Sequence, residues 1–135
     1  MKTYQNYING KWMDSLSKET IKVEDPASTN IIGEIACAKN DDIDLAVEAA
    51  KKAFHNRILV DMPILERAKL MRRIADETRK LAKEGGTLLC YENGKQISGG
   101  ISEFNSVADT FDYYAGLTDK LEGKTIPVSN SVLDY

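Results

Sequence analysis

Apolar and polar positions alternate over the first third of the chain, and this pattern predicts short strands. Residues 7–12 read Tyr-Ile-Asn-Gly-Lys-Trp. An Asn-Gly pair between apolar residues is typical of a tight β-hairpin, because both turn residues tolerate a positive φ. Further strands are expected at 21–24 and 31–36, joined by the turn sequence Asp-Pro-Ala-Ser-Thr-Asn. The pattern therefore predicts a small antiparallel sheet.

The period changes at Asp41 to the three-and-four spacing of an amphipathic helix. Asn40 is placed to cap this helix, and the acidic pair Asp41 and Asp42 is favourable in its first turn. One face of the helix is expected to be buried. Its members are Ile43, Ala46, Val47, Ala50 and Phe54.

A longer helix is expected from Pro63, which suits a first helical position. Its apolar side carries Leu65, Ala68, Met71, Ile74, Ala75 and Ala82. The pair Gly85-Gly86 predicts a kink, and Asn93-Gly94 predicts a left-handed end to the helix. The sequence up to residue 94 thus predicts two helices after the strands.

A third helix is expected to begin after Gly99-Gly100 and to end near Gly123. Its apolar positions are Phe104, Val107, Ala108, Phe111, Tyr114 and Leu117. The residues Ile126 to Val128 then predict a short extended segment. The whole pattern indicates strands first and helices afterwards.

Composition narrows the class of protein. A chain of 135 residues with 42% hydrophobic content is the size of one domain with a modest core. The net charge of -3 gives no basic surface for nucleic acid or acidic lipid, so we expect neither partner. There is no apolar run of roughly 18 residues and no signal-peptide core at the start. We expect a soluble, cytoplasmic protein.

The side chains that commonly carry catalysis are few. His55 is the single histidine, and it follows the first predicted helix; a solvent-facing or capping role suits it better than catalysis. Cys37 and Cys90 have no paired spacing, so both are expected to be packed thiols. The acidic pairs Asp41-Asp42 and Glu24-Asp25 are more typical of solvated turns and helix starts than of metal sites. The sequence assigns no catalytic and no cofactor-binding residue.

The order of the motifs is more informative than any single one. Along the chain they are YINGKWM, EDPAST with IIGEIA, DDIDLAVEAAKKAF, PILERAKLMRRIAD, ENGKQ and FDYYAGLTDKLEGKTIPV. In this order and at these spacings they resemble the N-terminal segment of the NAD(P)-dependent aldehyde dehydrogenase superfamily. The resemblance implies the α/β fold of that family. This segment would supply a small antiparallel hairpin and sheet followed by three main helices, without the Rossmann core.

The resemblance also implies a division of the chain. Residues 1–131 would form the N-terminal part of the cofactor-binding domain, and residues 132–135 would begin the oligomerisation strand. The catalytic domain would be absent, because the family's nucleophilic cysteine, general-base glutamate and oxyanion-hole asparagine all follow this segment. In the complete enzyme a thiolate attacks the aldehyde, hydride passes to NAD or NADP, and water releases the acid from a thioester. This chain alone is expected to bind no cofactor and to serve as a scaffold.

One site follows from the resemblance. Many family members hold a monovalent cation with two main-chain carbonyls just before an Asn-Pro or Asp-Pro turn and with the acidic residue before Asn-Gly-Lys. The matching positions here are Val23 and Glu24 for the main-chain carbonyls and Glu92 for the acidic residue. Oxygen ligands suit such a hard cation. The family takes a further ligand from downstream, so weak occupancy is expected in this chain alone.

The expected partners are the remainder of an aldehyde dehydrogenase chain or homologous subunits, and the complete enzyme is expected to be a homo-oligomer. A second hypothesis treats the chain as a stand-alone truncated paralogue that acts as an interaction or assembly module. The aldehyde substrate and the choice between NAD and NADP stay open.

Overall fold

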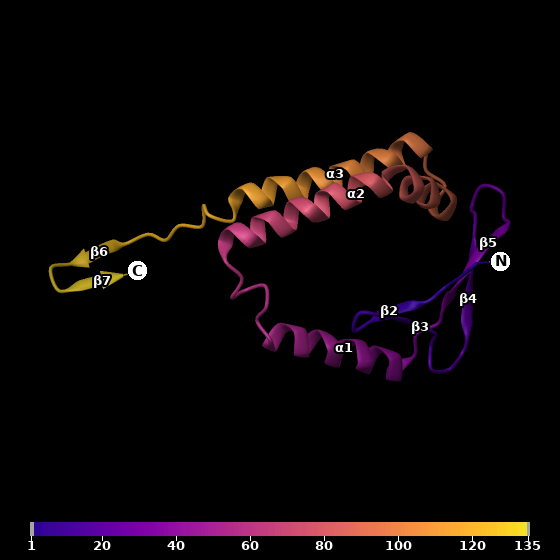
Figure 1. Cartoon of the computed structure of the whole chain (residues 1–135), viewed down its shortest axis with the longest axis horizontal. Coiled ribbons are helices and arrows are strands. Elements are labelled where there is room, and N and C mark those ends of the chain that lie inside the picture. Colours follow the sequence, from indigo (N-terminus) through magenta and orange to yellow (C-terminus); the bar gives the residue numbers. More distant parts are fainter. Residues whose placement is uncertain (1, 135) are drawn as a thin grey trace.

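The computed structural model describes residues 2–134. Short strands come first, three helices follow, and two further strands close the described chain (Figure 1). The strands are β1 (Thr3–Tyr4), β2 (Asn6–Ile8), β3 (Lys11–Met13), β4 (Thr20–Glu24), β5 (Ile31–Ala36), β6 (Ile126–Ser129) and β7 (Val132–Asp134). The helices are α1 (Asn40–His55), α2 (Ile64–Asn93) and α3 (Ile97–Leu117). This order confirms the predicted sequence of strands followed by helices.

The predicted Asn-Gly hairpin is confirmed. β2 and β3 pair antiparallel, with Tyr7 opposite Trp12. Asn9 has a φ of 52° and Gly10 a φ of 77°, so both turn residues adopt the left-handed conformation that a two-residue hairpin requires. The turn type therefore follows directly from the two residues at its centre.

The second sheet is mixed rather than purely antiparallel. β4 and β5 form the predicted antiparallel pair, and β1 adds to the free side of β5 in parallel, with Thr3 opposite Glu34. A strand of two residues is too short to carry an alternating pattern, which is why the sequence did not predict β1. Gly33 is buried at this junction, and a Cβ there would lie 3.2 Å from the carbonyl oxygen of Lys2.

The start of α1 is fixed by Asp42 rather than by Asn40. The cap residue is Lys39, and its backbone N–H donates to the Asp42 carboxylate at 3.0 Å. The predicted cap at Asn40 is wrong by one position, because an acidic side chain in the first turn can satisfy the free N–H of the residue before the helix.

The apolar face predicted for α1 forms, but no described residue buries it. Ile43, Val47 and Phe54 remain 51%, 44% and 77% exposed. The opposite side of the helix, which includes Leu45 and Ala49, faces the β2–β3 hairpin across a groove. The predicted face is therefore exposed in this chain, and the main contact of α1 is on its other side.

The buried apolar residues of the described chain lie where α2 and α3 run side by side (Figure 1). They are Ala68, Ala75, Ala82, Ala108 and Ala115. On each helix these alanines recur every seven residues, so they form one stripe along a helix pair that crosses at a shallow angle. Small side chains on both stripes let the two backbones approach closely. Larger residues of the predicted apolar side, such as Leu65 at 70% exposure, lie outside this contact.

Glycines extend this close contact at one end of the helix pair. A Cβ on Gly100 would lie 2.3 Å from the carbonyl oxygen of Gly86, and a Cβ on Gly85 would lie 2.1 Å from the Phe104 ring. α2 continues as a helix through Gly85 and Gly86. α3 begins at Ile97, so Gly99 and Gly100 lie inside it, not before it as predicted. Packing against Gly86 explains a glycine that propensity alone would place outside a helix.

The helix ends agree only partly with the prediction. Gly94 ends α2 with a φ of 77°, and its N–H donates to the Cys90 carbonyl at 2.8 Å, which confirms the left-handed stop. α3 ends at Leu117 rather than near Gly123. The residues from Lys120 to Thr125 are not helical, and none of them has a side chain buried against the rest of the chain.

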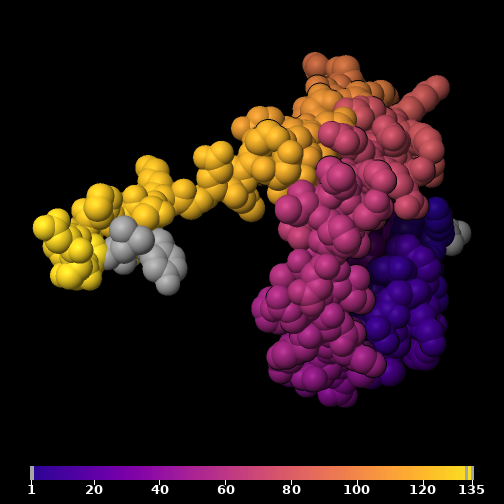
Figure 2. Space-filling model, turned by 60° about the vertical axis from the view of Figure 1, so that its left-hand side comes forward, coloured from indigo at the N-terminus to yellow at the C-terminus, as the bar shows by residue number. Residues whose placement is uncertain are grey.

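The chain ends in a second hairpin, β6–β7, which extends away from the helices (Figures 1 and 2). β6 confirms the extended segment predicted at residues 126–128. β7 contains the residues expected to begin an oligomerisation strand, except Tyr135, which lies outside the described residues. None of the helices within residues 2–134 is both long and apolar enough to cross a bilayer.

Candidate functional site

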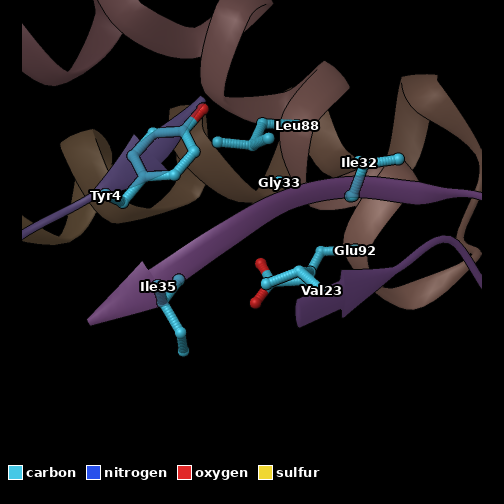
Figure 3. Close-up of a pocket in the computed structure, with 7 residues that line it drawn as sticks. All are labelled: Tyr4, Val23, Ile32, Gly33, Ile35, Leu88 and Glu92. Atoms are coloured by element: carbon cyan, nitrogen blue, oxygen red, sulfur yellow. The ribbon is translucent and has the colours of Figure 1, made fainter. Parts of the chain in front are cut away.

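A hollow of about 250 Å³ lies between the mixed sheet and the last turns of α2 (Figure 3). Its walls are mostly apolar, with a single carboxylate among them. The lining residues are Tyr4, Val23, Ile32, Gly33, Ile35, Leu88 and Glu92. They come from β1, β4, β5 and α2, so the hollow joins the two parts of the fold.

A contact between two turns holds α2 against the sheet. A Cβ on Gly94 would lie 3.2 Å from Cγ of Pro26, so the left-handed end of α2 rests on the turn between β4 and β5. Glu92 lies two residues before Gly94, and Glu24 lies two residues before Pro26. The same contact therefore brings both glutamates to one end of the molecule.

Asp25 gives the β4–β5 turn its shape. Its carboxylate accepts the Ser28 hydroxyl at 2.7 Å and the Ala27 N–H at 2.9 Å, and its own N–H donates to the Asn30 carbonyl. The Ser28 hydroxyl, followed by the Ala27 N–H, lowers the pKa of Asp25 from its ordinary value. Asp25 is buried and fully engaged within the turn. It is therefore a structural carboxylate and not a free ligand.

The structure brings together two of the three residues predicted for a cation site. Val23 and Glu92 both line the hollow (Figure 3). Glu24 is exposed and is not part of the lining. The strand pairing is irregular at this point, because Val23 is opposite Gly33 but Glu24 is opposite Ile31. The extra residue of this irregularity is Ile32 on β5, and Glu24 points away from the hollow because adjacent residues of a strand face opposite sides.

The residues around the hollow fit a monovalent cation only in part. Glu92 supplies a carboxylate, and the backbone at Val23 and Glu24 could supply carbonyl oxygens. A hard cation in a protein takes about six oxygen ligands or more, and the remaining lining here is apolar. Residues 2–134 contain no cluster of three or more His, Cys, Asp or Glu side chains able to hold a metal ion. Further ligands would have to come from water or from another part of a polypeptide.

The other candidates from the sequence lie apart from the hollow. His55 is exposed at the end of α1, and its Nδ1 lies 2.7 Å from the Lys51 carbonyl oxygen. Cys37 and Cys90 are half-buried free thiols. His55, Cys37 and Cys90 therefore do not line this hollow or the other hollows identified among residues 2–134.

Sequence reasoning missed the most deeply buried charged group, Asp42. Its carboxylate accepts the Ser15 hydroxyl at 2.7 Å and the backbone N–H groups of Leu16 and Lys39 at 3.0 Å each. The Lys39 backbone N–H, followed by the Leu16 N–H and the Ser15 hydroxyl, lowers the pKa of Asp42 from its ordinary value. An acidic residue three positions after a cap was the available signal. Asp42 ties the loop after β3 to α1, which is a structural role.

Comparison with known proteins identifies the family to which this fold belongs. The family model described as the aldehyde dehydrogenase family matches residues 12–135. The chain belongs to the aldehyde dehydrogenase family. The resemblance inferred from the ordered motifs is therefore confirmed.

Individual aldehyde dehydrogenases agree in sequence and in fold. Aldehyde dehydrogenase family 2 member B4, mitochondrial, of Arabidopsis thaliana is 35% identical over 128 residues, which cover 94% of this chain and 24% of that protein. The structure of an aldehyde dehydrogenase from Bacillus cereus has a TM-score of 0.87 at 30% identity over 98% of this chain and 27% of its own. A NAD-dependent aldehyde dehydrogenase from Sinorhizobium meliloti gives the same TM-score and coverage at 32% identity. The small sheet and three helices are thus a segment of the family fold.

The match covers only part of each relative. The chain spans about a quarter of the length of the curated aldehyde dehydrogenases it matches. The family assignment therefore concerns one segment of a much longer fold.

Proposed function

We propose that this chain functions as the N-terminal segment of a NAD(P)-dependent aldehyde dehydrogenase. In that role it supports the cofactor-binding domain, and it has no dehydrogenase activity in isolation. The complete enzyme would oxidise an aldehyde to a carboxylic acid. The observation that carries the proposal is the agreement of nearly the whole chain with about a quarter of the Bacillus cereus structure.

The exposed apolar surface of α1 favours a scaffolding role for this segment. Ile43, Val47 and Phe54 form an apolar stripe along α1 that no described residue covers. An amphipathic helix gains its stability by burying such a stripe. A larger polypeptide of the same family would provide the missing contact, in the same chain or as a separate subunit.

The cofactor of the complete enzyme would be NAD or NADP. The relatives support a nicotinamide cofactor: the Sinorhizobium meliloti enzyme is described as NAD-dependent, and a betaine aldehyde dehydrogenase from Staphylococcus aureus was solved with NAD+. Within residues 2–134 there is no strand that leads through a glycine-rich turn into a helix. The proposal therefore assigns cofactor binding to the rest of the enzyme.

A monovalent cation at Val23, Glu24 and Glu92 is part of the proposal. The hollow beside Glu92 supports it with one carboxylate, and the exposed position of Glu24 leaves the backbone of that residue as its contribution. Such a cation would join the end of α2 to the sheet. Its ligand set is complete only in the whole enzyme.

The terminal hairpin would lead into the oligomerisation strand of the complete enzyme. β6 is exposed along its whole length, and its only strand partner among the described residues is β7. An unpaired strand edge is a ready site for pairing with another chain. The cytoplasmic location expected from composition stays a prediction, since one relative is named as mitochondrial and another as peroxisomal.

The mass of the native protein tests the proposal. An antibody raised against this chain should detect a polypeptide several-fold heavier than 15.0 kDa in the source cells, and immunoprecipitates should reduce NAD or NADP when an aldehyde is added. A native species of 15.0 kDa that co-purifies with no dehydrogenase would overturn the proposal. A 15.0 kDa species bound to a longer dehydrogenase subunit would instead support the stand-alone assembly module.

A further inference from the structure

We propose that the groove between the β2–β3 hairpin and α1 binds a small amphipathic organic anion, such as an alkyl carboxylate. This groove shares no residue with the hollow at Glu92. The inference therefore does not depend on the cation site or on the proposed enzymatic function.

The hairpin contributes one side of the groove through its strand register. Ile8 is opposite Lys11, and Asn6 is opposite Met13. Residues directly opposite each other in an antiparallel pair share a face, so Ile8, Lys11 and Met13 lie on the same side of the hairpin. This side faces α1, with which the hairpin makes contact through β2 (Figure 1).

α1 contributes the opposite side of the groove. Leu45, Ala49 and Lys52 follow at intervals of four and three residues, which places them on one face of the helix. This face is distinct from the exposed stripe that contains Val47 and Phe54. Two regular elements, together with Asn9 of the hairpin turn, thus define the groove.

The size and lining of the groove suit a small ligand. Its volume is about 510 Å³, within the range of about 300–1,000 Å³ that is usual for small-molecule sites. Apolar side chains form most of its inner surface, whereas Trp12, which also borders the groove, is opposite Tyr7 on the other face of the hairpin. An alkyl or aryl group could displace water from these side chains with a favourable free energy.

The charges at the groove select an anion. Lys11 and Lys52 both line it, and neither forms an ion pair within residues 2–134. The third charged residue of the lining, Glu48, accepts the ammonium of Lys51 at 2.9 Å, so its charge is already paired. Two unpaired ammonium groups beside an apolar surface attract a ligand with an anionic head and an apolar body.

The heat of binding is the direct measurement, and Trp12, the single tryptophan, reports from the rim of the groove, where its ring lies against Tyr7. The probe is sodium octanoate, titrated into the full 135-residue chain while tryptophan fluorescence and the heat of binding are recorded. Saturable binding of one octanoate per chain is expected. Octyltrimethylammonium, with the same tail length and the opposite charge, is expected to bind several-fold more weakly.

Matched variants distinguish octanoate binding at the groove from a general effect of net charge. K11Q/K52Q should weaken octanoate binding about fivefold to tenfold, because two exposed ion pairs with the ligand are lost. K22Q/K83Q removes two exposed, unpaired lysines elsewhere and should leave binding unchanged. Ala49→Leu fills the groove and should abolish binding, with the helical circular dichroism retained. Absence of saturable binding, equal binding of the cationic probe, or equal loss in both double variants would overturn the proposal.

Discussion

The helix pair α2–α3 and the helix α1 both have apolar faces with helical periodicity, but these faces reach different levels of burial. Ala75 and Ala108 are fully buried where α2 meets α3, whereas Val47 and Phe54 on α1 stay largely exposed. The difference lies in the size of the side chains. Alanines and glycines specify close contact with a second helix of this chain. The larger aliphatic and aromatic residues of α1 specify a wider contact surface, for which the described chain has no partner.

This contrast shows that periodicity identifies a face but not what covers it. On α2, the larger residues beside the alanine stripe are also exposed, with Leu81 at 53%. Such a surface is unusual for a protein that is stable alone. On the proposed function, these surfaces are the ones that the rest of an aldehyde dehydrogenase covers.

Substitution at the contact between Gly86 and Gly100 should have the largest effect on the free energy of unfolding. Gly100→Ala places a Cβ 2.3 Å from the Gly86 carbonyl oxygen, so the helices must separate. The free energy of unfolding should fall by about 3 kcal/mol. Gly99→Ala is the matched control, since a Cβ there meets nothing within 4 Å, and it should stabilise α3 by about 0.5–1 kcal/mol. Urea unfolding followed by circular dichroism measures both. Equal effects of the two variants would contradict the close contact.

Loss of the Asp42 carboxylate should have the next-largest effect on the free energy of unfolding, because this carboxylate joins α1 to the loop after β3. The folded state lowers the pKa of Asp42 below its ordinary value of 3.8. Its contribution to stability is therefore present above the unfolded pKa and is lost as the pH falls through the lower, folded pKa. Asp42→Asn should reduce stability at neutral pH and flatten the decline in acid.

Asp41→Asn is the control for Asp42, because Asp41 is exposed and its side chain accepts no hydrogen bond among residues 2–134. Urea unfolding of both variants and of the wild-type chain across a pH series provides the comparison. An acid decline in Asp42→Asn as steep as that of the wild-type chain would show that another carboxylate causes it.

Gly94→Ala should have a moderate effect. The residue has a φ of 77°, and a Cβ there would also press on Pro26 at 3.2 Å. A non-glycine residue in the left-handed region costs about 1–2 kcal/mol. The contact between the end of α2 and the β4–β5 turn should loosen at the same time. Gly116→Ala, at a helical position with free space around it, should not destabilise the chain.

The smallest effect is expected on the exposed stripe of α1. Val47→Ala should change the free energy of unfolding of this chain by no more than about 0.5 kcal/mol, because little buried surface is lost. Ala75→Val, in the buried stripe of α2, should cost about 1–3 kcal/mol through overpacking. On the proposed function, Val47→Ala becomes more destabilising in the complete enzyme. An effect of Val47→Ala as large as that of Ala75→Val would contradict the contrast between the two regions.

Local signals in the sequence were sufficient for much of the fold. The Asn9-Gly10 turn and the left-handed Gly94 depend on the conformational freedom of those residues alone. Features that depend on distant contacts could not be predicted. β1 has only two residues, and position 100 needs a glycine within α3 because Gly86 lies against it.

The candidate site likewise has features that the sequence predicted and features that it did not. Val23 and Glu92 were matched through family motifs, and they do line one hollow. Alternation along β4 already places the Glu24 side chain on the face opposite Val23, so its position outside the hollow follows from the strand prediction. The acidic start of α1 was visible, but the burial of Asp42 depends on Ser15 and Leu16, which are far away in sequence.

Hydrogen exchange tests the central claim most directly, namely that α2 and α3 are packed within this chain while α1 depends on a larger polypeptide. In the isolated chain, amides of residues 68–86 and 100–115 should exchange slowly, and those of residues 43–55 should exchange much faster. In the native, full-size assembly, residues 43–55 should become as protected as the other two helices. Equal protection of all three helices in the isolated chain, or no added protection of α1 in the assembly, would contradict the account.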